Sequence, residues 1–189
     1  MRLTEFVGIR SGKISTLQAA KLAYQPISEA ANNLLQAELE KFDNNQINKK
    51  SFLRRSKKIL GSAYRQAYKQ GSGLNSISSD GERWIDSFAK KQHKYLESFA
   101  SDIEASEGVM DYDSRMSLYA NAVRAAYWGG SANESDVQMD WVTTAEESCE
   151  DCLENEAGSP YDPDKLPGVP GDGSTRCRTN CKCYLVRAR

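Results

Sequence analysis

Residues 79–103 have the sequence SDGERWIDSFAKKQHKYLESFASDI, and this stretch decides the fold class. Its large apolar side chains recur at the intervals of an α-helix: Trp84, Phe88, Tyr95, Phe99 and Ile103. Side chains at that spacing share one face of a helix, which predicts an amphipathic helix with this face in the protein core. Ser79 and Glu82 have the spacing of a capping box, so we expect the helix to begin there.

Helical patterns continue on the N-terminal side of this stretch. Apolar residues at helical spacing extend over 52–67, and Gly71-Ser72-Gly73 predicts the end of that helix. A similar pattern covers 14–39, where Pro26 is expected to kink or divide the helix because proline lacks an amide hydrogen and clashes with the preceding turn. We therefore expect two helical pieces before Asn44.

On the C-terminal side we expect one further helix, from about residue 114 to residue 127, with Gly129-Gly130 ending it. These helices complete the first part of the expected fold. The sequence predicts a mainly α protein with a helical body of about four to five helices over residues 1–130.

Beyond residue 130 the composition changes to Asp, Glu, Gly, Pro and Cys. Two short strand-like stretches, 139–144 and 183–186, predict a two-stranded ribbon, and the Pro- and Gly-rich residues 159–173 predict a long loop between them. A loop of that length usually needs something to hold it. We therefore expect residues 131–189 to form a small cysteine-rich, metal-binding module, a β-hairpin of zinc-ribbon type.

The formal net charge of −1 hides a division of sign. Residues 1–100 carry 17 Lys/Arg against 9 Asp/Glu, whereas residues 101–189 carry 8 against 17. No acidic residue lies between Asp43 and Asp80, and a dense basic group falls in that interval: Lys49, Lys50, Arg54, Arg55, Lys57 and Lys58. We expect these residues to contact packaged DNA or an acidic protein neighbour, including the acidic half of a second copy in a homo-oligomer.

All five cysteines lie in the last 41 residues: Cys149, Cys152, Cys177, Cys181 and Cys183. Two close groups of thiols separated by a loop are typical of a tetrahedral zinc site. Zn²⁺ takes four ligands, so Cys149 and Cys152 form one pair, and two of the other three complete the set. The alternatives are disulfides or scattered core thiols. His93 is the single histidine, and a shell of four thiolates leaves no open position, so we expect a structural site and no enzymatic activity.

Four short motifs occur in a fixed order in this C-terminal part: Trp141-x2-Thr144, Cys149-Glu150-Asp151-Cys152, Leu166-Pro167-Gly168-Val169-Pro170 and Asn180-Cys181-Lys182-Cys183. This order resembles the C-terminal module of phage head morphogenesis proteins, the Mu F-like minor head proteins. The resemblance covers roughly the last 50 residues. It implies a structural protein of the virion head that contacts the portal or the major capsid protein during head assembly or DNA packaging, after passing through the host cytoplasm.

The chain departs from the family's closing motif, because Arg178 stands where the usual histidine would be. Cys177 lies one position earlier and is interpreted as the replacement ligand. That interpretation pairs Cys177 with Cys181 and leaves Cys183 as a neighbouring core thiol. A strand that places Cys181 and Cys183 on the same face is the alternative.

Two further classes of protein stay open from the sequence: a nucleic-acid-binding protein with a zinc ribbon, and a metal-dependent enzyme. The first residues lack the apolar run of a signal peptide, and no stretch approaches the roughly 20 apolar residues of a membrane span, so we expect a soluble, non-secreted chain without a membrane partner.

Overall fold

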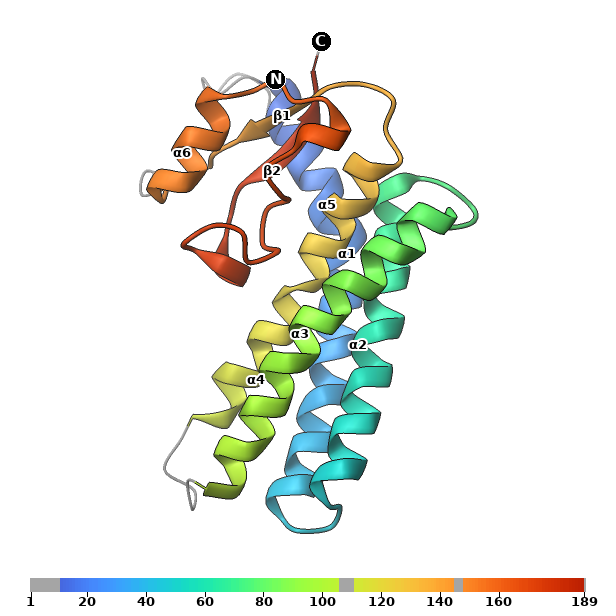
Figure 1. Cartoon of the computed structure of the whole chain (residues 1–189), viewed down its shortest axis with the longest axis vertical. Coiled ribbons are helices and arrows are strands. Elements are labelled where there is room, and N and C mark those ends of the chain that lie inside the picture. Colours follow the sequence, from blue (N-terminus) through green and yellow to red (C-terminus); the bar gives the residue numbers. More distant parts are fainter. Residues whose placement is uncertain (1–10, 106–110, 145–147, 189) are drawn as a thin grey trace, which may run out of the picture.

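The computed structural model describes residues 11–105, 111–144 and 148–188 of the chain. Residues 1–10, on which the absence of a signal peptide was argued, lie outside these ranges. The fold is mainly helical with one small two-stranded antiparallel sheet near the C-terminus, as the sequence predicts (Figure 1). Among the described residues, no helix combines the length and the apolar character needed to cross a bilayer.

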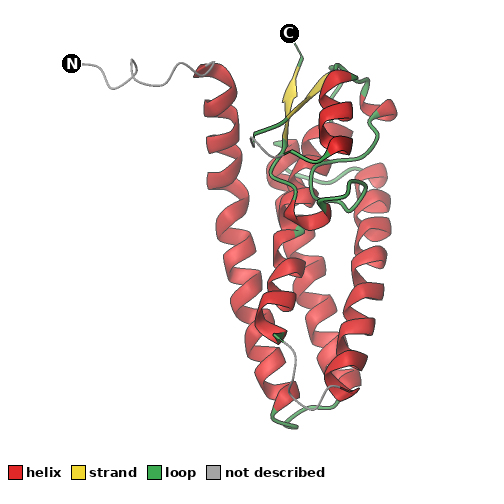
Figure 2. Ribbon diagram, turned by 90° about the vertical axis from the view of Figure 1, so that its left-hand side faces the viewer, coloured by secondary structure: helices red, strands yellow, loops and turns green. Residues whose placement is uncertain are grey.

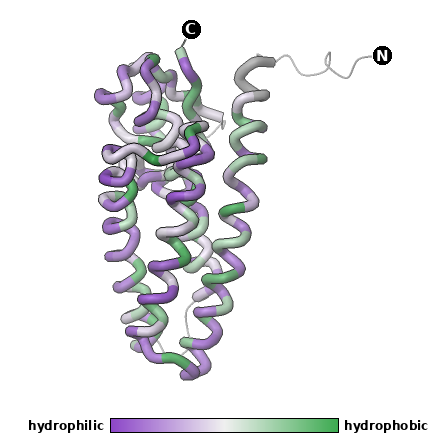
Figure 3. The backbone as a smooth tube through the Cα atoms, turned by 90° about the vertical axis from the view of Figure 1, so that its right-hand side faces the viewer, coloured by the Kyte–Doolittle hydropathy of each residue, from purple (hydrophilic) through white to green (hydrophobic). Residues whose placement is uncertain are grey.

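Four helical columns form an elongated bundle, and the module with the sheet lies at one end of it (Figures 1 and 2). The bundle helices are α1 (Ser11–Asp43), α2 (Lys49–Ser72), α3 (Ser79–Ala105), α4 (Tyr112–Asn121) and α5 (Val123–Asn133), of which α4 and α5 together form the fourth column. Polar and apolar segments alternate along each helix, as expected for helices that bury one face (Figure 3).

Helix α1 is a single helix that continues through Pro26, so the prediction of two separate pieces is wrong. Apolar side chains on both sides of the proline are buried in the same core: Tyr24, Ile27, Ala31 and Leu35. Proline removes one backbone hydrogen bond, whereas the packing of this continuous face stabilises the helix over its whole length.

Helix α2 ends where the sequence predicts. At its start the Asn48 side chain accepts a hydrogen bond from the Ser51 amide at 2.9 Å. At its end Gly73 adopts a left-handed conformation with φ of 68°, and its amide donates to the Lys69 carbonyl. A left-handed residue after the last turn favours glycine because glycine has no Cβ, so Gly73 ends the helix.

Helix α3 begins at Ser79, but its capping residue is Ser78, whose Oγ accepts a hydrogen bond from the Gly81 amide at 3.0 Å. The predicted capping box does not form, since Glu82 pairs with Arg65 on α2 instead. The predicted core stripe is correct at Phe88, Phe99 and Ile103 and wrong at one position. Tyr95 is 62% exposed, and its neighbour Leu96 is fully buried in its place.

The expected helix of residues 114–127 is divided at Ala122, and Gly129 and Gly130 lie inside α5 rather than after it. Gly129 faces the Trp84 ring of α3, and Gly130 packs closely against α2. A Cβ at Gly130 would lie 2.0 Å from the Tyr68 carbonyl oxygen, and one at Gly71 would lie 1.8 Å from the Tyr127 carbonyl oxygen. The two backbones therefore touch at a crossing that only glycines permit.

The C-terminal module contains β1 (Met139–Val142), α6 (Glu150–Ala157) and β2 (Tyr184–Arg187), with 3-10 turns at Pro163–Lys165 and Arg178–Asn180. Strands β1 and β2 pair antiparallel, with Met139 opposite Arg187 and Val142 opposite Tyr184, which confirms the predicted ribbon.

The module packs directly on the bundle. The rings of Trp128 on α5 and Tyr184 on β2 have their centroids 6.3 Å apart, and one buried core extends through both parts. Helix α5 also crosses residue 130, where the boundary was expected. The division at that residue into two separately folding units stays a prediction.

Candidate metal centre

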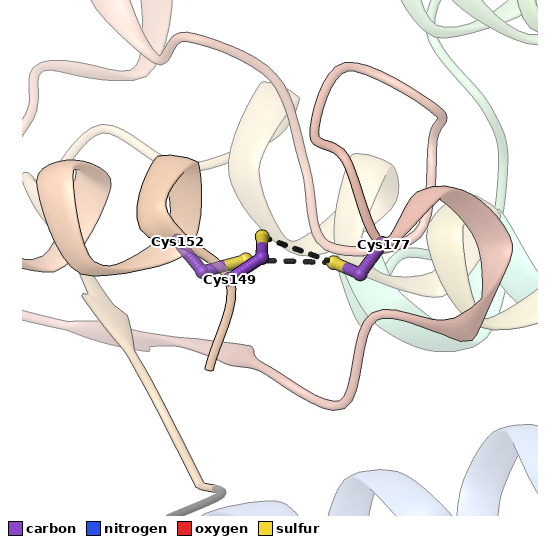
Figure 4. Close-up of side chains that lie close together, drawn as sticks. All are labelled: Cys149, Cys152 and Cys177. Carbon is purple, nitrogen blue, oxygen red and sulfur yellow. Dashed lines mark hydrogen bonds between the residues drawn. The ribbon is translucent and has the colours of Figure 1, made fainter. Parts of the chain in front are cut away.

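The five cysteines are brought together by three short elements of the module. Cys149 is the residue before α6, and Cys152 lies in the first turn of that helix. Cys177 and Cys181 flank the 3-10 turn Arg178–Asn180, and Cys183 immediately precedes β2. Because β1 pairs with β2, the start of α6 and the turn before β2 face each other, and Figure 4 shows Cys177 opposite Cys149 and Cys152.

The distances between the sulfurs are those of a metal-ligand shell. The Sγ atom of Cys177 lies 3.6 Å from the Sγ atoms of both Cys149 and Cys152, and the Sγ atoms of Cys152 and Cys181 are 3.7 Å apart. A tetrahedral zinc ion with Zn–S bonds of about 2.3 Å requires sulfurs about 3.8 Å apart. All five residues are free thiols in this structure, and their sulfurs are clustered rather than scattered through the core.

Two groups of three sulfurs share one member. Cys149, Cys152 and Cys177 have sulfurs within 4.8 Å of one another, and so do Cys152, Cys181 and Cys183. Cys152 therefore lies at the centre of the cluster. In the described residues every such group consists of cysteine alone, without histidine or carboxylate. The cluster could hold a metal ion, and its ligands would all be sulfur.

Burial makes this cluster a closed site. Cys152 and Cys181 are each 1% exposed, and Cys183 is 4% exposed, whereas Cys149 and Cys177 are half-buried. Buried thiols without a metal are ordinary core residues, but four or five of them with facing sulfurs are not explained by packing. A thiolate cluster closed to solvent is typical of a structural metal site.

Hydrogen bonds and burial give the thiols of the cluster different pKa values. The side chain and then the backbone amide of Cys183 lower the pKa of Cys181 to about 5, against the opposing effect of burial. Burial also opposes the shift at Cys149, where hydrogen bonds from Cys152 and Cys177 nevertheless lower the pKa. Burial raises the pKa of Cys177 to about 11 and raises that of Cys152 as well. The cluster thus places Cys181, which ionises readily, beside neighbours whose raised pKa values keep them protonated.

These shifts predict that metal binding releases protons. The raised pKa values keep Cys152 and Cys177 protonated at neutral pH, and each must lose its proton to ligate a metal. Metal affinity should therefore fall as the pH is lowered from 8 to 6. Titration of the metal into weakly buffered apo-protein with a pH indicator should show at least two protons released per ion, and an affinity independent of pH would contradict this.

An ionic contact that the sequence analysis missed joins the two halves of the centre. The Arg176 amide donates to the Asp151 carboxylate at 2.7 Å, and its guanidinium lies 2.7 Å from Glu150 and 3.2 Å from Asp151. Buried Thr175 places its hydroxyl 3.2 Å from the Cys177 sulfur. The sequence contains a signal for this contact, because two acidic residues lie between Cys149 and Cys152 and a basic residue directly precedes Cys177.

The predicted basic contact residues lie on α2, and half of them have acidic partners within the chain. Lys49 pairs with Glu104 at 2.8 Å, Arg55 with Glu38 at 3.1 Å, and Lys57 with Glu97 at 2.5 Å. The positive charge that is unrelieved along the sequence is therefore partly neutralised by α1 and α3. The other three side chains are exposed on α2: Lys50, Arg54 and Lys58.

No family model, curated protein or solved structure matches this chain. What can be said of its function therefore rests on its own residues and their geometry.

Proposed function

We propose that the cysteine cluster is a structural zinc site held by Cys149, Cys152, Cys177 and Cys181. The observation that carries this proposal is the run of three sulfur contacts of 3.6–3.7 Å, which links these four residues with separations close to a tetrahedral edge. Thiolate ligands favour Zn²⁺ over hard cations such as Mg²⁺ and Ca²⁺. Cys183 remains beside the site as a buried thiol.

Zinc here would add covalent cross-links to the small part of the hydrophobic core that lies in the module. Its four bonds cross-link the start of α6 to the turn before β2 and so close the long connection between them. The ribbon that follows packs on α5 through Tyr184 and Trp128. The ion therefore fixes the module on the end of the bundle, and the chain presents one rigid surface.

We propose further that the protein is a non-enzymatic minor head protein of a tailed phage, which acts through protein contacts with the portal or the major capsid protein. The resemblance of its last 50 or so residues supports this role, as does a metal shell made of sulfur alone. Lys50, Arg54 and Lys58 are exposed and make no ion pair with the described residues, which favours a second candidate, a zinc-ribbon protein that binds nucleic acid. The ion pairs of Lys49, Arg55 and Lys57 weigh against it.

Removal of the metal should unfold the module and leave the helices. A zinc chelator added to the reduced protein should abolish the near-ultraviolet circular dichroism of Trp141, which lies in β1, while most of the far-ultraviolet helical signal persists. Added zinc should restore the near-ultraviolet signal, whereas added magnesium should not. An unchanged spectrum after complete metal removal would contradict a structural role.

Co-expression with the portal and major capsid proteins of the same phage tests the proposed partners. We expect the chain to co-purify with one of them and to bind duplex DNA weakly. Duplex binding that is tight at low salt and falls steeply with rising salt, together with no capture by either head protein, would favour the second candidate.

A further inference from the structure

A cavity of about 210 Å³ lies where the bundle meets the module. Three parts of the chain line it: Tyr24 and Ser28 from α1, Asn121 and Arg124 from the fourth column, and Thr179, Asn180 and Lys182 from the segment before β2. The volume is far more than one water needs and below the roughly 300–1,000 Å³ of sites for drug-sized ligands. It suits a small group.

The lining is cationic and polar. Arg124 and Lys182 supply two positive charges, and every other lining residue carries a hydroxyl or an amide. No acidic residue lines the cavity, and in the described part of the chain neither cation makes an ion pair. This differs from α2, where Lys49, Arg55 and Lys57 each find a carboxylate. Two uncompensated cations beside one cavity attract an anion.

Arg124 is held in place but is not fully satisfied. Its Nη2 atom donates to the Thr179 carbonyl at 3.3 Å, and its guanidinium also hydrogen-bonds the Tyr24 side chain. Its Nε atom is buried and has no acceptor among the described residues. The contacts with Thr179 and Tyr24 order the guanidinium before any ligand binds, which lowers the entropy cost of binding.

We propose that this cavity binds a phosphate group. Its donors come from three separate elements and include a guanidinium, an ammonium, hydroxyls and side-chain amides. A tetrahedral oxyanion accepts hydrogen bonds from several directions at once, whereas a carboxylate accepts mainly in its own plane. None of its lining residues is a proposed zinc ligand, but Thr179, Asn180 and Lys182 belong to the segment that the zinc would fix, so the site rests on the proposed zinc role and is tested on zinc-loaded protein.

Calorimetric titration of the full chain with inorganic phosphate, at constant ionic strength in chloride, tests the site. We expect saturable binding, and Lys182→Gln should weaken it about tenfold because one charge-assisted hydrogen bond is lost. Lys90→Gln is the matched control, since Lys90 is an exposed lysine on α3 that does not line the cavity, and the affinity of this variant should equal that of the wild type. Arg124→Gln should abolish binding, with circular dichroism to confirm that this variant is folded.

Competition identifies the source of the phosphate. Displacement of inorganic phosphate by a nucleoside monophosphate but not by duplex DNA assigns the site to small phosphate esters, and displacement by duplex assigns it to a nucleic-acid backbone. Both results support a phosphate site. The proposal is overturned by the absence of binding heat up to tens of millimolar phosphate, or by equal affinities of the Lys182→Gln and Lys90→Gln variants. Lys182→Gln decides the question even where Arg124→Gln fails to fold.

Discussion

Replacing Cys152 with serine will remove the metal from the protein and unfold the C-terminal module. Cys152 is 1% exposed, and its sulfur belongs to both groups of three facing thiols. Any set of four ligands drawn from these two groups that keeps the contacts between them therefore includes Cys152. Loss of a residue that only supports a ligand typically costs about 10–100-fold in metal affinity, and loss of the central ligand should cost more than about 100-fold. Competition with a chromogenic zinc chelator measures this difference.

The matched control for this experiment is Cys183→Ser. Cys183 is equally buried in the same cluster, but it lies outside the proposed ligand set. We expect the Cys183 variant to retain one zinc ion per chain and the Cys177 variant to lose it. In the reverse result, the Cys183 variant loses zinc and the Cys177 variant retains it. That result would show that Cys181 and Cys183 supply the second half of the site.

Replacing Gly130 with alanine will destabilise the whole fold. The added Cβ would lie 2.0 Å from the backbone oxygen of Tyr68, and a backbone atom inside a packed helix pair moves only if the helices separate. We expect the free energy of unfolding, measured by urea denaturation, to fall by about 3 kcal/mol. The same substitution at Gly71 should have a similar effect, because it meets the same crossing from the other helix.

Gly61→Ala separates this steric effect from helix propensity. Gly61 also lies inside α2, but a Cβ there would meet only the end of the Arg65 side chain at 3.5 Å. Alanine should therefore stabilise the protein by about 0.5–1 kcal/mol. Equal effects of alanine at positions 61 and 130 would contradict the close crossing of α2 and α5.

Local patterns predicted the elements of this fold well where the physical cause was itself local. The apolar spacing of residues 79–103, the left-handed cap at Gly73 and the ribbon formed by residues 139–144 and 183–186 all follow from neighbouring residues. The cysteine cluster was predictable for a related reason, since a ribbon with thiols at both ends brings those thiols together.

The predictions failed where distant residues determine the outcome. Pro26 was expected to divide α1, but the core on both sides of it keeps the helix continuous. Gly129-Gly130 was expected to end a helix, yet both glycines lie inside α5. Gly129 faces Trp84 on α3, and Gly130 faces α2. The acidic partners of Lys49, Arg55 and Lys57 come from α1 and α3, so no scan along α2 could have found them.

X-ray absorption spectroscopy at the zinc edge, on protein purified under reducing conditions and assayed for metal, tests the central claim most directly. The account predicts one zinc ion per chain, surrounded by four sulfurs at about 2.3 Å with no nitrogen or oxygen ligand. The sulfur contacts of 3.6–3.7 Å are close to the edge length of such a shell. Protein that is folded and free of metal, or zinc bound through oxygen and nitrogen, would contradict it.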